Sequence, residues 1–194
     1  MASLVPPPRS SPESDDCAQW YARELDWATA GTSPVRLLTG LRFDVLELPA
    51  AAGHAALRRV GRTGPVALAG QRMRLLVAAG SADELPGLLD WLEWGGIALD
   101  LSAVGVGGHI TAPVPPGRAT GSPGAAFWLR PPGPRQEAER SLPVLGRLGS
   151  SGGDAPDLVR LVDAAATECH RATLAHARTH LWTHRPTGQP LAFS

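Results

Sequence analysis

Apolar and polar positions alternate in short blocks along the first two thirds of the chain and predict a series of strands and helices. Apolar residues that recur at every second position, between glycine and proline breaks, indicate strands. We expect strands at residues 35–38, 43–48, 66–69, 73–78, 97–101, 109–112 and 127–129. Apolar residues at helical spacing behind capping residues indicate helices at residues 14–28, 51–60 and 81–92. Because strands and helices are interleaved, the pattern predicts an α+β fold with a mixed sheet and flanking helices.

A long helix is predicted at residues 154–184, where Asp154 can cap the first turn and Pro156 lies within it. Its apolar residues follow a period of about 3.6 residues, so one face is expected to be buried. These residues are Leu158, Leu161, Val162, Ala165, Cys169, Ala172 and His176. We expect this stripe to pack on the sheet of its own domain, and docking on a partner protein is the alternative.

Proline, glycine and serine are concentrated in two segments that we expect to lie outside the folded core. Residues 1–13 are expected to be disordered, and residues 133–153 are expected to connect a domain at 14–132 to the last helix. With 194 residues, the chain has the length of one domain with an added helix.

Composition restricts the possible chemistry. All 18 basic residues are arginine, so the chain has no lysine for a Schiff base or a phosphate-binding loop. The formal net charge is zero, so nucleic-acid binding would need a local arginine patch. Cys17 and Cys169 lie far apart in the sequence, which is typical of a reduced, cytoplasmic protein. No apolar run approaches the roughly 20 residues that span a bilayer, so we expect no membrane association.

The predicted strand at residues 43–48 carries two acidic residues, Asp44 and Glu47. A carboxylate is costly to bury, so a metal, a cation or a strand end is expected beside it. Side chains alternate between the two faces of a strand, so acids three positions apart lie on opposite faces. A two-metal catalytic site needs carboxylates that converge, and a regular strand here supplies one to each face.

Four segments follow one another in an order that is typical of a known family. They are Thr39-Gly40 with the acidic strand to Pro49, then Gly70 to Leu75, then Ile97 to Leu101, and finally Ala112 to Gly117 with Gly121 and Phe127-Trp128. In order and spacing, these segments resemble the bifunctional DNA primase/polymerase N-terminal (prim-pol) domain of the archaeo-eukaryotic primase superfamily.

The resemblance implies a primase-polymerase-like domain that has lost catalytic groups. Glu47 matches the first acid of the family's first motif, but Pro49 stands where the second acid is expected. Arg72 replaces a histidine that helps to hold nucleotide phosphates, and Asp100 matches the acid of the third motif. Glu47 and Asp100 are then vestigial catalytic acids that can hold one Mg²⁺ or Mn²⁺. The implied function is binding of a nucleotide or nucleic acid in a regulatory role, without nucleotide transfer.

Arginines near these acids are candidates for phosphate binding. Arg72 and Arg74 lie two positions apart and therefore project from one face of their strand. Arg118 follows in the proline-rich segment. Guanidinium groups bind phosphates well, and a solvated strand face is the alternative interpretation.

Two other functions remain open. An active, metal-dependent primase or polymerase needs a replacement for the missing acid, such as Asp44 brought to the other face by a β-bulge. A protein-interaction module without a nucleotide site needs an apolar stripe that is free on the last helix. The neutral net charge favours this module over nucleic-acid binding, whereas the order of the motifs favours binding.

Three further patterns are less specific. His176, His180 and His184 repeat every four residues and can share a metal, although histidine near a helix end also suits the helix dipole. Trp91 and Trp94 can stack on bases, but tryptophans more often cover a small core. The glycines at residues 105–108 indicate a hairpin turn rather than a phosphate loop.

Overall fold

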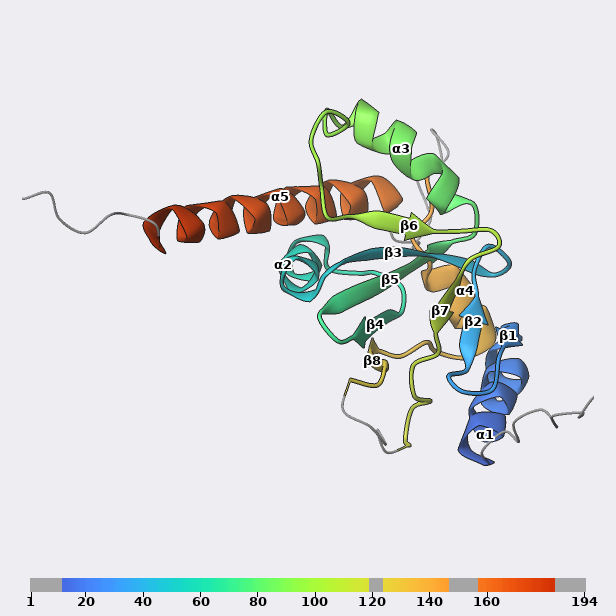
Figure 1. Ribbon diagram of the computed structural model, residues 1–194. Helices are drawn as coiled ribbons and strands as arrows, with labels where there is room; N and C mark the ends of the chain where they lie inside the picture. The colour runs from blue at the N-terminus through green and yellow to red at the C-terminus, as the bar shows by residue number, and fades with distance from the viewer. Residues whose placement is uncertain (1–11, 119–123, 147–156, 184–194) are drawn as a thin grey trace, which may run out of the picture.

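The structure, a computed structural model, describes residues 12–118, 124–146 and 157–183 (Figure 1). It confirms the α+β class, because helices pack against two sheets whose strand ladders are antiparallel. The segment 1–13, expected to be disordered, lies outside the described residues except for its last two positions. In the described part of the chain, no helix has both the length and the apolar character needed to cross a membrane.

A five-stranded sheet forms the centre of the fold. Its strands are ordered β6 (Ser102–Val104), β3 (Phe43–Pro49), β5 (Arg72–Ala78), β4 (Val66–Ala69) and β8 (Phe127–Arg130). The ladder between β3 and β5 runs without a bulge, from Phe43 opposite Ala78 to Pro49 opposite Arg72. Because the ladder is regular, the side chains of β3 alternate strictly between the two faces of the sheet.

Helices cover one face of this sheet. They are α2 (Ala50–Val60), α3 (Ser81–Trp91) and α5 (Leu158–Thr183) (Figure 1). Leu46 and Leu48 of β3 point into this core, together with alternate residues of β4 and β5. α5 contributes Leu158, Leu161, Val162, Ala165 and Cys169. The predicted apolar stripe of the last helix therefore packs on the sheet of its own domain as far as Cys169.

The opposite face of the sheet is divided into an apolar end and a polar end. At the apolar end, Phe43, Val45 and Leu76 belong to a second core. This core lies beneath a three-stranded sheet, ordered β1 (Thr29–Ala30), β2 (Arg36–Leu38) and β7 (His109–Thr111). Three helical segments complete this side: α1 (Pro12–Trp20), the π-helical turn η1 (Tyr21–Leu25) and α4 (Arg135–Ser141). At the polar end, Glu47, Arg72 and Arg74 take the place of apolar residues.

Two predicted boundaries need correction. The helix expected at residues 14–28 ends at Leu25, because Asp26 has a left-handed backbone with a φ of 55°. The segment at 133–153 is more than a connector, since it contains α4. Ala138 of α4 is buried in the second core. Because α4 has only seven residues and Ala138 is its one buried residue, the sequence shows little helical periodicity here.

The strand predicted at residues 97–101 is wrong. These residues form a loop, and β6 begins only at Ser102, opposite Glu47. The loop looks like a strand in the sequence because Leu99 and Leu101 pack against the helix-covered core. The hairpin expected at the glycines 105–108 is also absent: β6 and β7 belong to different sheets, and this turn carries the chain from one sheet to the other.

Gly40 is required where this turn passes close to the start of β3. Its φ is 83°, and a Cβ atom there would lie 2.3 Å from the Cα atom of Val106. Thr39 holds the same turn, because its hydroxyl donates to the Gly105 carbonyl at 2.6 Å and its amide donates to the Gly108 carbonyl at 3.1 Å. The Thr39-Gly40 pair is therefore a packing contact between the two sheets.

The substitution Gly40→Ala is expected to destabilise the fold clearly more than Gly70→Ala. Both glycines have positive φ, but only the Cβ at residue 40 would meet backbone atoms, and nothing lies within 4 Å at residue 70. Urea unfolding should show a loss of about 1 kcal/mol for Gly70→Ala and at least about twice that for Gly40→Ala. Equal losses would mean that the approach of Val106 imposes no constraint.

Candidate functional site

The register of β3 and β5 brings three predicted site residues together on one face of the central sheet. Glu47 lies opposite Arg74, and Pro49 lies opposite Arg72. Residues that face one another across two strands share a side of the sheet, and diagonal neighbours are within reach of long side chains. Glu47 is therefore placed to contact both arginines.

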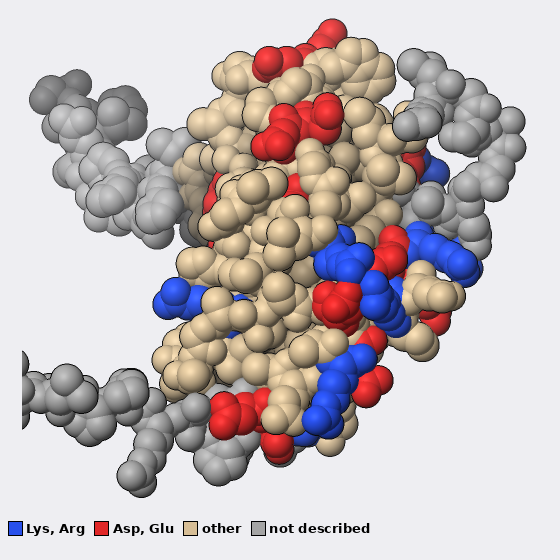
Figure 2. All heavy atoms as spheres, turned by 90° about the vertical axis from the view of Figure 1, so that its right-hand side faces the viewer, with Lys and Arg blue, Asp and Glu red and all other residues tan. Residues whose placement is uncertain are grey.

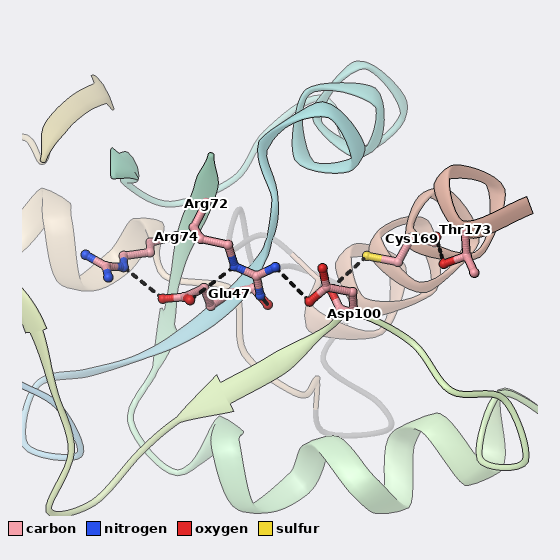
Figure 3. A network of polar contacts seen from close by, with 6 residues as sticks. All are labelled: Glu47, Arg72, Arg74, Asp100, Cys169 and Thr173. Atoms are coloured by element: carbon pink, nitrogen blue, oxygen red, sulfur yellow. Dashed lines mark hydrogen bonds and ion pairs between the residues drawn. The ribbon is translucent and has the colours of Figure 1, made fainter. Parts of the chain in front are cut away.

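A chain of ion pairs connects these side chains to Asp100 (Figure 3). Arg74 Nε donates to Glu47 Oε2 at 2.9 Å, and Arg72 Nε donates to Glu47 Oε1 at 3.2 Å. Arg72 Nη1 also donates to Asp100 Oδ1 at 2.7 Å. The Arg72 guanidinium thus lies between two carboxylates. We call Glu47, Arg72, Arg74 and Asp100 the arginine–carboxylate network.

Asp100 is held in place from its backbone side by α5. It lies in the loop before β6, between Leu99 and Leu101, which both pack against the helix-covered core. The Cys169 thiol donates to the Asp100 carbonyl oxygen at a Sγ–O distance of 3.4 Å (Figure 3). The sheet and the last helix therefore position Asp100 without the help of Arg72.

Burial and charge fix the protonation states in this region. Burial raises the pKa of the Cys169 thiol to about 11, and the charge of Asp100 contributes to the increase. The thiol therefore keeps its proton at neutral pH and can donate it. Partial burial alone lowers the pKa of Arg72, but hydrogen bonds to Asp100 and Glu47 outweigh this effect, so the pKa is raised. Arg72 is a permanent cation.

The network is neutral as a whole, because two arginines face two carboxylates. The exposed fraction of its side chains ranges from 15% for Arg74 to 59% for Asp100. Ion pairs with this degree of exposure add little to stability, so their main consequence is for what else can bind here. Arg74 Nη1 is buried and has no hydrogen-bond partner among the described residues.

The residues present do not fit a divalent metal at Glu47 and Asp100. Mg²⁺ and Mn²⁺ bind carboxylate oxygens directly, and here a guanidinium engages an oxygen of each carboxylate. A unit positive charge about 4 Å from a divalent ion opposes its binding by on the order of 8 kcal/mol at an effective dielectric constant of about 20. Within the described ranges, no group of three or more His, Cys, Asp or Glu residues is arranged to hold a metal.

Asp44 lies on the opposite face of β3, away from the network. Its side chain is 1% exposed, and Oδ2 accepts a hydrogen bond from the Ala82 amide at 2.9 Å. Ala82 lies in the first turn of α3, so Asp44 caps this helix from a neighbouring strand. The β3–β5 ladder contains no bulge that turns Asp44 toward Glu47. The structure therefore places Asp44 as a cap of α3, on the face of β3 opposite to Glu47.

Arg118, the third predicted phosphate ligand, is not part of the network. Its guanidinium pairs with Asp16 of α1 at 3.2 Å. Cys17 lies in the same helix, where burial raises the pKa of its thiol and the charge of Arg118 opposes the increase. The structure thus brings Arg72 and Arg74 together but places Arg118 beside α1.

The remaining sequence candidates lie elsewhere. Trp91 is 71% exposed at the end of α3, whereas Trp94 donates to Asp163 of α5 at 3.3 Å. His176 Nδ1 lies 2.8 Å from the carbonyl oxygen one turn earlier on α5. The side chain of His180 and the whole of His184 lie outside the described residues.

A second neutral set of ion pairs was not predicted from the sequence. Asp26 pairs with Arg42 and, at 3.0 Å, with Arg135, and both arginines lie 3.6 Å from Glu139 of α4. Figure 2 shows a side of the molecule on which basic and acidic side chains lie next to one another. Apart from Arg135 and Glu139, these residues lie far apart in the sequence, so no local pattern links them. The contact of Cys169 with Asp100 was missed for the same reason.

The free energy of unfolding is expected to fall as the pH rises from about 9 to about 11, and Cys169→Ser should reduce this fall. The thiol has a pKa of about 11 when folded against a model value of 9.0, so the folded state retains a proton that the unfolded state loses. The contribution is complete below pH 9 and is lost toward pH 11. Chemical unfolding at a series of pH values measures the slope. Cys17→Ser is the comparison, because this partly exposed thiol should change the slope less.

No protein-family model, curated protein or solved structure matches this chain. The function proposed below therefore rests on the residues and geometry of the chain itself and on the resemblance of its four sequence segments.

Proposed function

We propose that the chain is a catalytically inactive primase-polymerase-like domain that binds a nucleotide or nucleic acid in a regulatory role. The observation that carries the proposal is the arginine–carboxylate network, in which Arg72 contacts both Glu47 and Asp100. Metal-dependent nucleotide transfer needs carboxylates that are free to bind ions on the side of the reacting phosphate. In this chain the two acids of the matching motifs are instead paired with arginine.

The binding part of the proposal is supported by the side chains around the network. Arg72 and Arg74 project from one face of β5, and each guanidinium is paired with a carboxylate. A phosphate can replace a carboxylate as the partner of such a group, because both accept paired hydrogen bonds.

An active enzyme is less well supported. Pro49 cannot supply the second acid of the first motif, and Asp44 is occupied as the cap of α3 on the other face. Activity would therefore need both carboxylates of the network to leave Arg72 and a further ligand to come from elsewhere.

Binding is tested with two probes in the presence of EDTA: a fluorescent single-stranded oligonucleotide, followed by anisotropy, and ATP, followed by thermal stabilisation. We expect the chain to bind at least one probe more weakly as salt increases. Arg74→Gln should weaken binding about tenfold, because it removes a charged donor. Arg59→Gln is the matched control, since Arg59 forms an exposed pair with Glu168 away from the network. Binding of neither probe, or equal binding by both variants, would contradict the proposal.

A protein-interaction module is the second candidate, and the distal part of α5 favours it. Leu174 is 50% exposed, and most described side chains from Arg171 to Arg178 are exposed, whereas the proximal half is buried in the core. Figure 1 shows this end of α5 projecting beyond the sheet. The distal half is thus available to a partner without any change in the fold.

Truncation separates the two halves of α5. A chain that ends after Thr173 is expected to keep a free energy of unfolding within about 1 kcal/mol of the full chain, because exposed residues contribute little. A chain that ends after Asp157 should lose cooperative unfolding, because five buried side chains of the core are removed. Circular dichroism during urea unfolding distinguishes them. A large loss after Thr173 would show that the distal half stabilises the domain.

A further inference from the structure

The position of Arg72 differs from that of an ordinary surface arginine. Its guanidinium contacts carboxylate oxygens from two separate elements, Glu47 of β3 at 3.2 Å and Asp100 of the loop before β6 at 2.7 Å (Figure 3). Its Nη2 also lies 3.4 Å from the Glu47 carbonyl oxygen. A bound cation would bridge the same two carboxylates. Arg72 thus occupies the place of an ion while being attached to the chain.

The backbone of both acids is held by the fold and not by Arg72. Glu47 lies within the regular β3–β5 ladder and is also paired with Arg74 at 2.9 Å. Asp100 is fixed through its carbonyl oxygen by the Cys169 thiol and through its apolar neighbours. Removing the Arg72 side chain therefore leaves the backbone of both acids in place, with the Asp100 carboxylate free to turn toward an ion. The charge of the network then changes from zero to minus one.

We infer that Arg72 is a tethered cation that replaces a divalent metal between Glu47 and Asp100 and thereby closes this site to metal ions. The chain needs no metal to neutralise the two carboxylates. An external ion must displace the guanidinium of Arg72, which is covalently attached to the chain and therefore always present at the site. Arg74 does not share this role, because it contacts Glu47 but not Asp100. The inference concerns the metal only, so it holds or fails independently of nucleotide binding.

The test measures binding of Mn²⁺ alone, by the loss of the electron paramagnetic resonance signal of the free ion. Arg72→Ala is expected to bind one Mn²⁺ at least about tenfold more tightly than the unaltered chain. Arg74→Ala is the matched control: it removes the same unit of charge from Glu47 but keeps the bridge between the two acids, so its gain in affinity should be clearly smaller than that of Arg72→Ala. Adding Glu47→Gln and Asp100→Asn to Arg72→Ala should abolish the gain. A folded Arg72→Ala variant with unchanged affinity, or an equal gain in Arg74→Ala, overturns the inference.

A measurement on the unaltered chain covers the case in which Arg72→Ala does not fold. We expect millimolar Mn²⁺ to leave its midpoint of thermal unfolding unchanged, with the same result for the Glu47→Gln/Asp100→Asn variant. Stabilisation of the unaltered chain by Mn²⁺ that disappears in the double variant would show an open metal site and would overturn the inference. Arg72→Lys, which keeps the charge on a single donor group, should retain most of the exclusion of Mn²⁺.

Discussion

The alternation of side chains along β3 is the constraint on which both cores and the candidate site depend. Leu46 and Leu48 point to the helices, while Phe43, Val45 and Glu47 point to the other side. Because the side-chain period of a strand is two residues, a slip of one position would bury Glu47 among the leucines and expose the core. The unbroken pairing with β5 prevents such a slip. The placement of Glu47 beside two arginines is therefore a direct consequence of how the hydrophobic core is built.

Charge is balanced locally in this protein as well as overall. The two four-membered ion-pair sets each contain two arginines and two carboxylates, and each connects elements that are distant in the sequence. Arginine suits this arrangement, because its planar group can contact two carboxylates at once and keeps its charge at any accessible pH. A net charge of zero therefore does not mean that the surface lacks charge. In these two sets the charges of the arginines are met by neighbouring acids, which limits the attraction of this part of the surface to nucleic acid.

The sequence predicted most strands and helices, because their hydrophobic periods are local. It also placed Arg72 and Arg74 on one face and Asp44 and Glu47 on opposite faces, since alternation depends only on spacing. Predictions failed where tertiary contacts decide the structure. Leu99 and Leu101 give residues 97–101 the look of a strand but pack as part of a loop against a core, and α4 is stabilised by a few contacts that leave little periodicity. The bridge from Arg72 to Asp100 and the thiol contact of Cys169 join residues 28 and 69 positions apart, so no local pattern reveals them.

The docking of α5 has a consequence for how the polypeptide reaches its native state during synthesis. The apolar face of β3, β4 and β5 is completed by side chains between Leu158 and Cys169, which leave the ribosome after the whole sheet has been made. Contacts of such large sequence separation form slowly, and until they form a leucine-rich surface stays open to solvent. Transiently exposed apolar surface of this kind is prone to aggregation. The last helix is thus the element that ends this vulnerable period.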